Sequence, residues 1–328
     1  MKFGWLCSHE SYQPELLVEQ AIAAEEAGFD AVFASDHFHP WVDDDSAAGF
    51  VWSWFGAVAA LTRHVELVTS VTTPLYHYHP ALVAQAAATV DRLSNGRMRL
   101  GVGTGENINE GPMGLPFPGY KERSARMSEA IQIMRRLFAG EKVTFEGEYY
   151  RTDRAKLYSP PLGPVPIWLA AGGEKSAEMA GREADGLIVS VKVPAEAESA
   201  IIGPFRRAAG VPKTIVATRW VIYARDDESA WGAIGSMRGL RAPGRLEAVD
   251  PMDLRIRADE MPRAEILDKY ARATNVDELV ETYRPLVEEV GADYVSIQVA
   301  CPDPLATIRL IGAEVLPRLR RLTPASAA

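Results

Sequence analysis

Short apolar runs alternate with longer segments of helical periodicity along almost the whole chain. Eight of these runs are apolar at nearly every position, which is typical of strands buried on both faces. They cover residues 3–7, 30–35, 65–71, 97–102, 166–170, 186–190, 214–222 and 293–299. Residues 14–27, which follow the first run, have helical apolar spacing and end at Gly28, a residue that favours a helix C-terminus. Eight strand–helix units predict an α/β fold, the (β/α)8 TIM barrel.

Two segments interrupt this alternation and are expected to be insertions in the barrel. Residues 141–164 have the pattern of a hairpin followed by a loop, and residues 241–262 are rich in Pro, Arg and Asp and are expected to be irregular. Helices are expected on either side of the second insertion, over residues 227–240 and near 263–272. We therefore expect one domain over residues 1–328, with insertions at about 141–164 and 241–262.

An open, doubly wound sheet is the alternative architecture. Such a sheet usually begins with a glycine-rich dinucleotide loop after its first strand. The residues that follow the first predicted strand, Cys7 to Pro14, contain no glycine. The barrel is therefore the preferred interpretation.

The composition argues against several classes of function. Lys plus Arg number 35 and Asp plus Glu number 44, and the resulting net charge of −9 argues against a nucleic-acid or anionic-membrane partner. The two cysteines, Cys7 and Cys301, are too few for a disulfide scaffold and fit a reducing compartment. No apolar stretch approaches the length of about 18 residues that a membrane span needs, and the first residues lack the apolar run of a signal peptide. We expect a cytoplasmic enzyme.

In a TIM barrel the active site lies where the strands end, because the loops at that face carry the chemistry. Four titratable residues follow the first, second and fourth predicted strands: Glu10, Asp36, His37 and Glu106. His37 is suited to take a proton near neutral pH, and Trp41 nearby offers an indole N–H. The sequence predicts acid–base chemistry at this face, with a structural histidine as the alternative role of His37.

Two other kinds of site would lie at the same face. A metal-dependent hydrolase barrel uses a His-x-His pair, as in His37 and His39, together with His or Asp from later strands. All six histidines lie at or before His79, so we expect no metal site.

Gly172 and Gly173 precede a predicted helix at residue 174, where free N–H groups suit a phosphate. A tight turn between strand and helix is the alternative there.

Three sequence blocks at these strand ends resemble the luciferase-like flavin and deazaflavin oxidoreductases. The blocks are residues 35–41 (Ser-Asp-His-Phe-His-Pro-Trp), 69–74 (Thr-Ser-Val-Thr-Thr-Pro) and 101–106 (Gly-Val-Gly-Thr-Gly-Glu), and the likeness extends over nearly the whole chain. The first block is specific to the group that contains the F420-dependent glucose-6-phosphate and secondary alcohol dehydrogenases. The resemblance implies a TIM barrel and the cofactor coenzyme F420, a 5-deazaflavin that carries hydride.

The resemblance also implies which residues bind this cofactor. They are Asp36, Ser70, Val71, Thr73, Gly105, Glu106, Asn109, Ala171, Gly172 and Gly173. The pair Ser70–Val71 matches a non-prolyl cis peptide that backs the deazaflavin ring. The backbone from Ala171 to Gly173 matches a cradle for the phosphate of the cofactor.

Catalytic roles are implied for His37, Trp41, Glu106 and Glu10. His37 matches the base that takes the proton of a substrate hydroxyl, and Trp41 matches a partner that stabilises the developing species. Glu106 would supply or relay a proton to the reduced ring, with Glu10 nearby tuning the pKa of Glu106. Which of the two carboxylates is the acid stays open.

Three basic residues, Lys192, Arg245 and Lys269, fall at or near the positions that grip the substrate phosphate in the glucose-6-phosphate enzymes. Lys192 is shifted by one residue, and two of the three are exchanges between Lys and Arg, which keep charge but change geometry. Arg255 and Arg257 lie on the same insertion as Arg245 and are further candidates. Solvated surface charges are the alternative for all of them.

The implied reaction is oxidation of the C1 hydroxyl of a sugar 6-phosphate, such as glucose 6-phosphate, with hydride transfer to the deazaflavin C5. An F420-dependent secondary alcohol or free-sugar dehydrogenase is the alternative. An FMN-dependent luciferase-like monooxygenase is a more distant one, because such enzymes usually lack the block at residues 36–41. A deazaflavin-binding protein without activity would leave His37 and Glu106 without a role. The resemblance further implies a homodimer, and Trp52, Trp54 and Phe55 are expected to be exposed for it.

Overall fold

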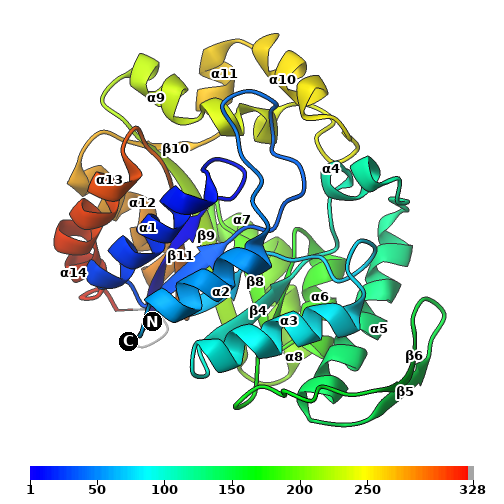
Figure 1. The fold of residues 1–328 in the computed structure, drawn as a ribbon. Helices are drawn as coiled ribbons and strands as arrows, with labels where there is room; N and C mark the ends of the chain where they lie inside the picture. Colours follow the sequence, from blue (N-terminus) through cyan, green and yellow to red (C-terminus); the bar gives the residue numbers. More distant parts are fainter. Residues whose placement is uncertain (324–328) are drawn as a thin grey trace.

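Eight parallel strands close into a barrel in the computed structural model, which describes residues 1–323 (Figure 1). The barrel strands are β1 (Lys2–Cys7), β2 (Ala31–Ala34), β3 (Glu66–Thr69), β4 (Met98–Val102), β7 (Ile167–Ala170), β8 (Gly186–Ser190), β9 (Thr214–Tyr223) and β11 (Tyr294–Ala300). They pair in this order, and β11 pairs with β1 to close the ring. Nearly every strand position is buried, because one side faces the barrel interior and the other faces helices. The predicted TIM barrel is confirmed.

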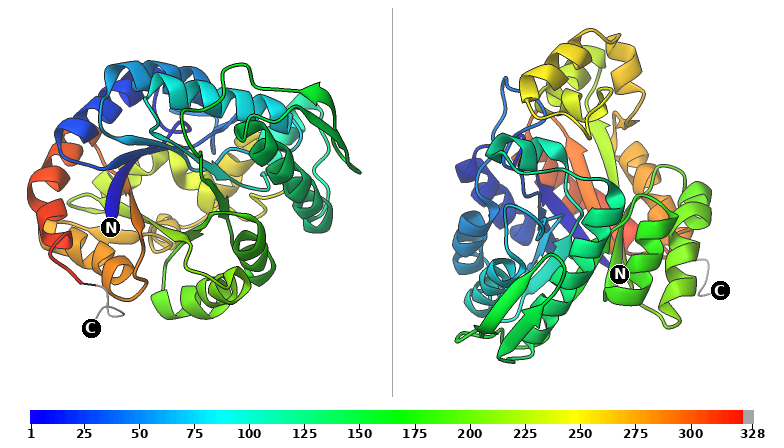
Figure 2. Two further views of the ribbon diagram at one scale, coloured as in Figure 1. Left: turned by 90° about the horizontal axis from the view of Figure 1, so that it is seen from below. Right: turned by 90° about the vertical axis from the view of Figure 1, so that its right-hand side faces the viewer.

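Helices surround the barrel as an outer layer (Figure 2). They are α1 (Pro14–Glu26), α2 (Val51–Leu61), α3 (Pro80–Leu93), α5 (Tyr120–Phe138), α6 (Glu174–Glu183), α7 (Pro194–Ala197), α8 (Gly203–Ala209), α12 (Val276–Glu288), α13 (Pro304–Leu310) and α14 (Leu316–Leu319). The other helices follow the C-terminal ends of β4 and β9: α4 (Asn107–Glu110), α9 (Asp227–Ala233), α10 (Pro251–Asp259) and α11 (Arg263–Leu267). Proline stands in the first turn of α1 and of α3, where a missing N–H costs no helical hydrogen bond. Among residues 1–323, no helix combines the length and the apolar character needed to cross a membrane.

The first predicted insertion is the hairpin of β5 (Val143–Glu146) and β6 (Arg151–Ala155). The second differs from the expectation of an irregular stretch, because it contains the helix α10. The proline that suggested a break, Pro251, occupies the first turn of α10, and the Asp250 side chain caps the helix by accepting from the N–H of Met252.

The helices expected on either side of this insertion are shorter than predicted. The predicted helix 227–240 ends at Ala233 and continues as the 3₁₀ segment η3 (Gly235–Arg241). The predicted helix near 263–272 ends at Leu267 and is followed by the strand β10 (Ala271–Ala273), which pairs with β9 beyond the end of β8. Three residues are too few for a period-2 signal, so this strand left no mark on the hydrophobic pattern.

The chain from α9 to α11 forms a lobe above the C-terminal ends of the barrel strands (Figure 1). Its buried residues, among them Met237 and Leu254, share a hydrophobic cluster with Trp41 and Ile108, which follow β2 and β4. Arg238 in the lobe also pairs with Asp44, at 2.7 Å, in the loop after β2. The lobe therefore roofs the face of the barrel where an active site is expected.

The three aromatic residues that were expected at the surface, in a dimer contact, are buried. Trp52, Trp54 and Phe55 belong to α2 and are 9%, 4% and 0% exposed, so they are core residues and not the exposed side chains that were expected. Of the three, Trp52 also lines a surface groove. The two cysteines, Cys7 and Cys301, are free thiols and both are buried.

Gly101 marks the place where β3 and β4 approach each other closely beside the expected site. A Cβ atom there would overlap the carbonyl oxygen of Thr69 and would lie 2.7 Å from Cδ1 of Ile188. We predict that Gly101→Ala lowers the free energy of unfolding by about 1–3 kcal/mol, because an overpacked site must shift its backbone. Urea unfolding measures this change.

Gly232→Ala in α9 is the matched control, since a Cβ there has no neighbouring atom within 4 Å. This variant should be neutral or gain up to about 1 kcal/mol. Equal losses in the two variants would contradict the close approach at Gly101.

Candidate active site

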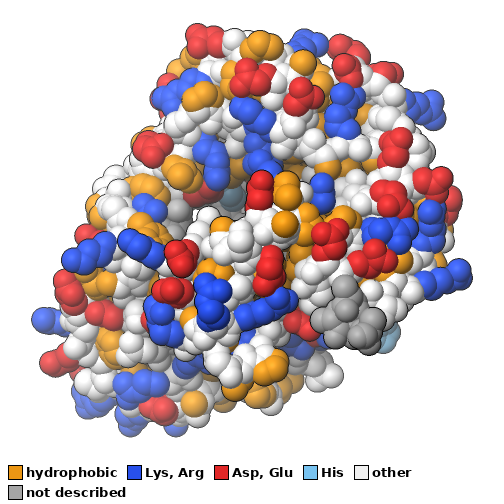
Figure 3. Space-filling model, turned by 180° about the vertical axis from the view of Figure 1, so that it is seen from behind, with side chains coloured by type: hydrophobic (Ala, Val, Ile, Leu, Met, Phe, Trp, Pro, Cys, Tyr) orange, Lys and Arg blue, Asp and Glu red, His pale blue; other side chains and the backbone are white. Residues whose placement is uncertain are grey.

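A cavity of about 420 Å³ opens at the C-terminal ends of the strands, under the lobe. This volume is in the range of pockets that hold small molecules. The predicted site residues in its lining are Glu10, Asp36, His37, Trp41, Ser70, Val71, Thr73, Gly105, Glu106, Asn109, Ala171, Gly172 and Arg245. Figure 3 shows a hollow on one face of the molecule with basic side chains at its edge. The structure thus brings residues from the ends of β1, β2, β3, β4 and β7 to one opening.

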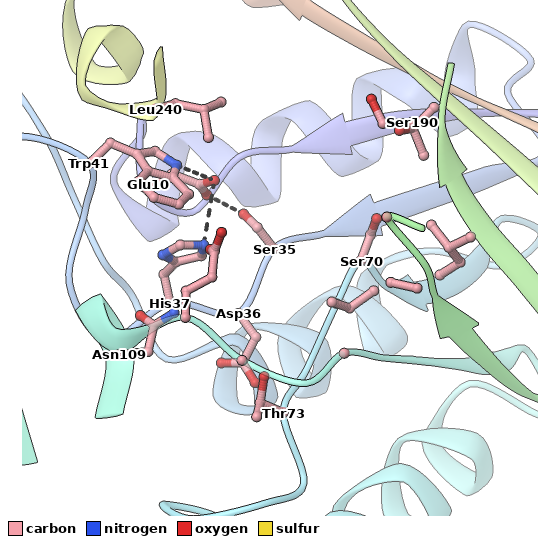
Figure 4. A pocket seen from close by; sticks show the side chains of 18 of the residues that line it. Glu10, Ser35, Asp36, His37, Trp41, Ser70, Thr73, Asn109, Ser190 and Leu240 are labelled. Carbon is pink, nitrogen blue, oxygen red and sulfur yellow. Dashed lines mark hydrogen bonds and ion pairs between the residues drawn. The ribbon is translucent and has the colours of Figure 1, made fainter. Parts of the chain in front are cut away.

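The buried carboxylate of Glu10 organises one wall of this cavity (Figure 4). Its Oε2 accepts a hydrogen bond from the hydroxyl of Ser35, and its Oε1 accepts one from the indole N–H of Trp41 at 3.3 Å. Burial raises the pKa of Glu10, but the neighbouring His37 and the Ser35 hydrogen bond together outweigh it, and the pKa lies below its ordinary value. Glu10 is therefore an ionised, fixed carboxylate at neutral pH.

The environment of His37 decides which ring nitrogen can act as a base. Its Nδ1 lies 3.0 Å from the carbonyl oxygen of His39, and a carbonyl can only accept, so Nδ1 carries the proton in the neutral ring. The lone pair is then on Nε2, which lies 4.0 Å from Oε1 of Glu10. Trp41 packs edge-on against the imidazole, with ring centroids 4.9 Å apart. This arrangement presents an oriented base beside a carboxylate that stabilises its protonated form.

The side chain of Asp36 forms its hydrogen bonds with the loop after β3, away from the residues around Glu10 that His37 faces. Its carboxylate accepts hydrogen bonds from the hydroxyl of Thr72 and, at 3.3 Å, from the hydroxyl of Tyr78. Burial raises the pKa of Asp36, and the Thr72 hydrogen bond and the charge of His77 oppose this rise. Asp36 is thus held by the loop after β3, and His37 faces the residues around Glu10.

Backbone and small side chains form another part of the lining. The peptide bond between Ser70 and Val71 is cis, as the resemblance implied. Gly103 lies against Val71, where a Cβ atom would come 2.6 Å from the Val71 side chain. Gly105 has a φ of +83°, a conformation that favours glycine. A wall of this kind lets a flat ring approach the backbone closely.

The expected phosphate cradle lies at the start of α6. Ala171 and Gly172 line the cavity, and Gly173 is the residue before α6. A Cβ atom on Gly172 would have no neighbour within 4 Å, so the backbone there is open to a ligand. The N-terminus of α6 adds the positive end of a helix dipole, which favours an anion. Asn109 belongs to α4 and also lines the cavity. Its Oδ1 accepts a hydrogen bond from the N–H of Phe38 at 2.9 Å.

Glu106 has a different neighbour from the one expected. Its carboxylate forms an ion pair with the guanidinium of Arg245 from the lobe. Glu10 was expected to tune the pKa of Glu106, but Glu10 contacts Ser35, Trp41 and His37 instead. Glu10 therefore acts on His37, and Arg245 is the charged neighbour of Glu106.

A smaller cavity of about 200 Å³ adjoins the first, and we call it the basic pocket. Its basic lining residues are Lys192, Arg219, Arg241 and Lys269, and of its described lining residues Asp268 alone is acidic. Ser190, Trp220 and Arg241 line both cavities. The two cavities are therefore adjacent parts of one opening.

The charges in the basic pocket are only partly compensated: Lys269 pairs with Glu265 at 3.4 Å, whereas Lys192, Arg219 and Arg241 form no ion pair among the described residues. Burial lowers the pKa of Lys192, and the positive charges of Arg241, Lys269 and Arg245 lower it further. The Nε of Arg241 is buried and has no hydrogen-bond partner among the described residues. An anion in this pocket would relieve both features.

The three basic residues expected to grip a phosphate are divided between the two cavities. Lys192 and Lys269 line the basic pocket, whereas Arg245 lines the larger cavity. Arg255 and Arg257 are in the lining of neither cavity. Arg255 pairs with Asp43 and joins the lobe to the loop after β2, and Arg257 donates to the carbonyl of Pro243 within the lobe at 3.2 Å.

Sequence reasoning missed Ser35, Arg219 and Arg241. Arg219 interrupts the apolar run of β9, which is a signal for a polar pocket at a strand end. Arg241 precedes Arg245 by four residues in the same insertion and carried no separate signal.

Within residues 1–323, no group of three or more His, Cys, Asp or Glu is arranged to hold a metal ion.

Comparisons with known proteins agree with this architecture. Two curated relatives are F420-dependent glucose-6-phosphate dehydrogenases: that of Nakamurella multipartita is 39% identical, with 98% of this chain and 97% of the relative covered, and that of Segniliparus rotundus is 36% identical, with 98% and 99% covered. A solved F420-dependent secondary alcohol dehydrogenase in complex with an F420–acetone adduct is 31% identical, with a TM-score of 0.91 over 97% of this chain and 99% of that one. The family described as luciferase-like monooxygenase matches residues 1–295. The chain therefore belongs to the luciferase-like family.

Proposed function

We propose that this protein is an F420-dependent dehydrogenase that oxidises the C1 hydroxyl of a sugar 6-phosphate, such as glucose 6-phosphate. The curated relatives that carry this name cover almost the whole chain at 35–39% identity. The single observation that carries the substrate class is the basic pocket, which adjoins the cavity that holds His37. One opening thus combines a base for a hydroxyl with a site for a dianionic group.

The larger cavity fits coenzyme F420. Its residues offer a backbone wall at Ser70, Val71 and Gly103, and open backbone at Gly172 beside the start of α6. When bound, a deazaflavin supplies a hydride acceptor at C5. Asp36, Thr73, Gly105 and Asn109 would hold the ring and its side chain, and Ala171, Gly172 and Gly173 would hold the phosphate.

His37 is the proposed base for the substrate hydroxyl. Because Nδ1 donates to the His39 carbonyl, Nε2 is free to take the hydroxyl proton. The carboxylate of Glu10 then stabilises the imidazolium across 4.0 Å. Trp41 donates its N–H to Glu10 and packs on His37, which restrains both groups. Here Trp41 acts mainly as a positioning residue for the base.

Glu106 is the proposed proton donor of the site. Of the two carboxylates considered, Glu10 has a lowered pKa and three contacts that favour its ionised form. Glu106 instead has one movable partner, Arg245, whose side chain is 33% exposed. Glu106 is therefore the better candidate to exchange a proton during turnover.

The likeness to the secondary alcohol dehydrogenase keeps a second function in view, an F420-dependent alcohol or free-sugar dehydrogenase. The same base and cofactor wall would serve a secondary alcohol. The basic pocket favours the sugar 6-phosphate over the alcohol as substrate, since an uncharged alcohol gains no ionic contact from the four basic side chains of the pocket. An FMN-dependent monooxygenase is a weaker proposal, because the solved monooxygenases of similar fold are 15–22% identical and share the fold alone.

We further propose one domain, a cytoplasmic location and a homodimer. The apolar surface that supports a dimer is a groove of about 340 Å³ between α2 and α3. Phe50, Leu82 and Leu93 in its lining are more than half exposed. A two-fold axis would bring this surface against its own copy and cover these side chains.

Replacing the proposed base tests the mechanism. We predict that His37→Ala lowers kcat by about 10²–10⁴, because the general base is lost. The affinity for coenzyme F420, measured by fluorescence titration, should change little. The matched control is His39→Ala, which removes the neighbouring imidazole and keeps the carbonyl that orients His37. If His37→Ala retains full kcat, the base lies elsewhere.

A second test removes one cation of the basic pocket. We predict that Lys269→Ala lowers kcat/KM for glucose 6-phosphate by about 10- to 100-fold, the value of one charge-assisted contact of about 1.5–3 kcal/mol. The effect on free glucose should be small, and added salt should reduce the difference between the two substrates. The control is Arg272→Ala, since Arg272 pairs with Asp227 and does not line the pocket. Equal losses for both substrates would refute a phosphate site.

The dimer has a direct test. We predict that wild-type protein has twice the chain mass by light scattering at micromolar concentration, and that Leu82→Asp shifts it toward the monomer by placing a charge in the apolar contact. Leu162→Asp, at another half-exposed leucine, is the control and should stay dimeric. A monomeric wild type would refute the proposal.

A further inference from the structure

Two buried polar side chains, Gln298 on β11 and Thr218 on β9, line the larger cavity from inside the barrel. They are 7% and 6% exposed. Within residues 1–323 both form hydrogen bonds through their backbone alone, for example from the Tyr283 hydroxyl to the carbonyl of Gln298 at 3.2 Å. Burying polar groups without partners is unfavourable, so these two side chains are expected to bind a group that enters the cavity.

The barrel interior beneath these side chains is mostly apolar. One buried hydrophobic cluster draws its members from strands all round the barrel: Leu6, Ala31, Phe33, Val68, Trp168, Ile188, Val216 and Tyr294. Ser296 on β11 is also buried in the interior, but it lines neither of the two cavities. A leucine at position 298 would suit this core better than glutamine, so the amide is not there for packing.

The strand order places Gln298 between the base and the basic pocket. β11 pairs with β1 on one side and with β9 on the other. Glu10, which lies beside His37, follows β1. Trp220, which lines the basic pocket, lies on β9 and is the register partner of Gln298. Gln298 therefore stands at the middle of the path from the base to the cations.

The proposed cofactor wall lies on the other side of the cavity. In the closed ring of strands, β11 stands opposite β4. Ser70 and Val71 follow β3, and Gly103 follows β4. A flat ring against that wall leaves the β11 side of the cavity to the substrate.

A substrate with its reacting hydroxyl at His37 and an anionic group in the basic pocket must cross the end of β11. Ser190, which lines both cavities, lies across the opening from His37 (Figure 4). In a sugar 6-phosphate the part that makes this crossing is the pyranose ring, with hydroxyls at C2, C3 and C4. A primary amide both donates and accepts hydrogen bonds, so Gln298 matches two neighbouring hydroxyls.

We propose that Gln298 is a specificity-determining residue that hydrogen-bonds the ring hydroxyls of a sugar 6-phosphate, with Thr218 on the neighbouring strand as a second contact. The proposal rests on the proposed function and deepens it, because it adds a site for the sugar ring to the base and the phosphate pocket. Isopropanol has no second hydroxyl to offer this amide. Gln298 therefore favours sugars over simple alcohols by hydrogen bonding, independently of charge.

The experiment is isothermal titration of 1,5-anhydroglucitol 6-phosphate into the full-length protein. This ligand keeps the ring hydroxyls and the phosphate but lacks the C1 hydroxyl, so binding is measured without the reaction. We expect Gln298→Leu to weaken its binding about 5- to 100-fold, because a buried ring hydroxyl then has no partner. The affinity for inorganic phosphate should be unchanged. Thr218→Val should weaken binding of the sugar phosphate in the same way.

Two controls separate binding from folding. Ser296→Ala removes a buried hydroxyl from the same strand outside the cavities, and should bind the sugar phosphate as the wild type does. Urea unfolding should show no loss of stability in Gln298→Leu, because the amide has no protein partner to lose. If Gln298→Leu fails to fold, Thr218→Val, which keeps the shape of threonine, is the variant that decides.

The outcomes that contradict this inference differ from those that contradict the proposed function. Unchanged binding of the sugar phosphate in Gln298→Leu, with glucose 6-phosphate still oxidised by the wild type, would overturn the ring site alone. Equal losses for the sugar phosphate and for inorganic phosphate would also refute a separate ring contact. No binding of the sugar phosphate to the wild type, together with no oxidation of glucose 6-phosphate, would overturn the proposed function and the ring site with it.

Discussion

Burying the carboxylate of Glu10 at the end of β1 is costly unless polar groups surround it. The fold supplies these partners from neighbouring segments: a hydroxyl from Ser35 at the end of β2, the indole N–H of Trp41 from the loop beyond, and the imidazole of His37. Each partner is positioned because the ends of β1 and β2 are adjacent in the barrel. The carboxylate therefore restrains the His37 imidazole and ties the loop after β2, with the lobe packed on Trp41, to the barrel.

The site separates its charges in space. The carboxylates of Glu10 and Asp36 lie in the larger cavity, and basic side chains gather in the adjoining basic pocket. Binding energy gained on a remote anionic group can orient the reacting hydroxyl toward Nε2 of His37. Arg245 lies at the border of the two regions, where it pairs with Glu106.

The sequence predicted the barrel and most of the large cavity because both depend on local signals. Continuous apolar runs mark strands buried on both faces, and the polar residues that follow them must meet at one face of a barrel. The missed features depend on tertiary contacts instead. The strand β10 is too short to have a period, α10 begins at a proline that resembles a breaker, and Arg241 joins Lys192 only because the lobe folds back over β8 and β9. The partner of Glu106 could not be predicted either, since Arg245 is 139 residues away along the chain.

We propose that one opening combines a base for a hydroxyl, a wall for a deazaflavin and a pocket for a phosphate. The measurement that tests it most directly follows the absorbance of oxidised coenzyme F420 with glucose 6-phosphate, glucose and isopropanol, with FMN in place of F420 as a parallel series. We predict that glucose 6-phosphate bleaches F420 with a kcat/KM about 10²-fold or more above that of the unphosphorylated substrates, from two or three charge-assisted contacts, and that FMN is not reduced. Turnover of isopropanol or free glucose that equals or exceeds that of glucose 6-phosphate, or activity with FMN alone, would contradict it.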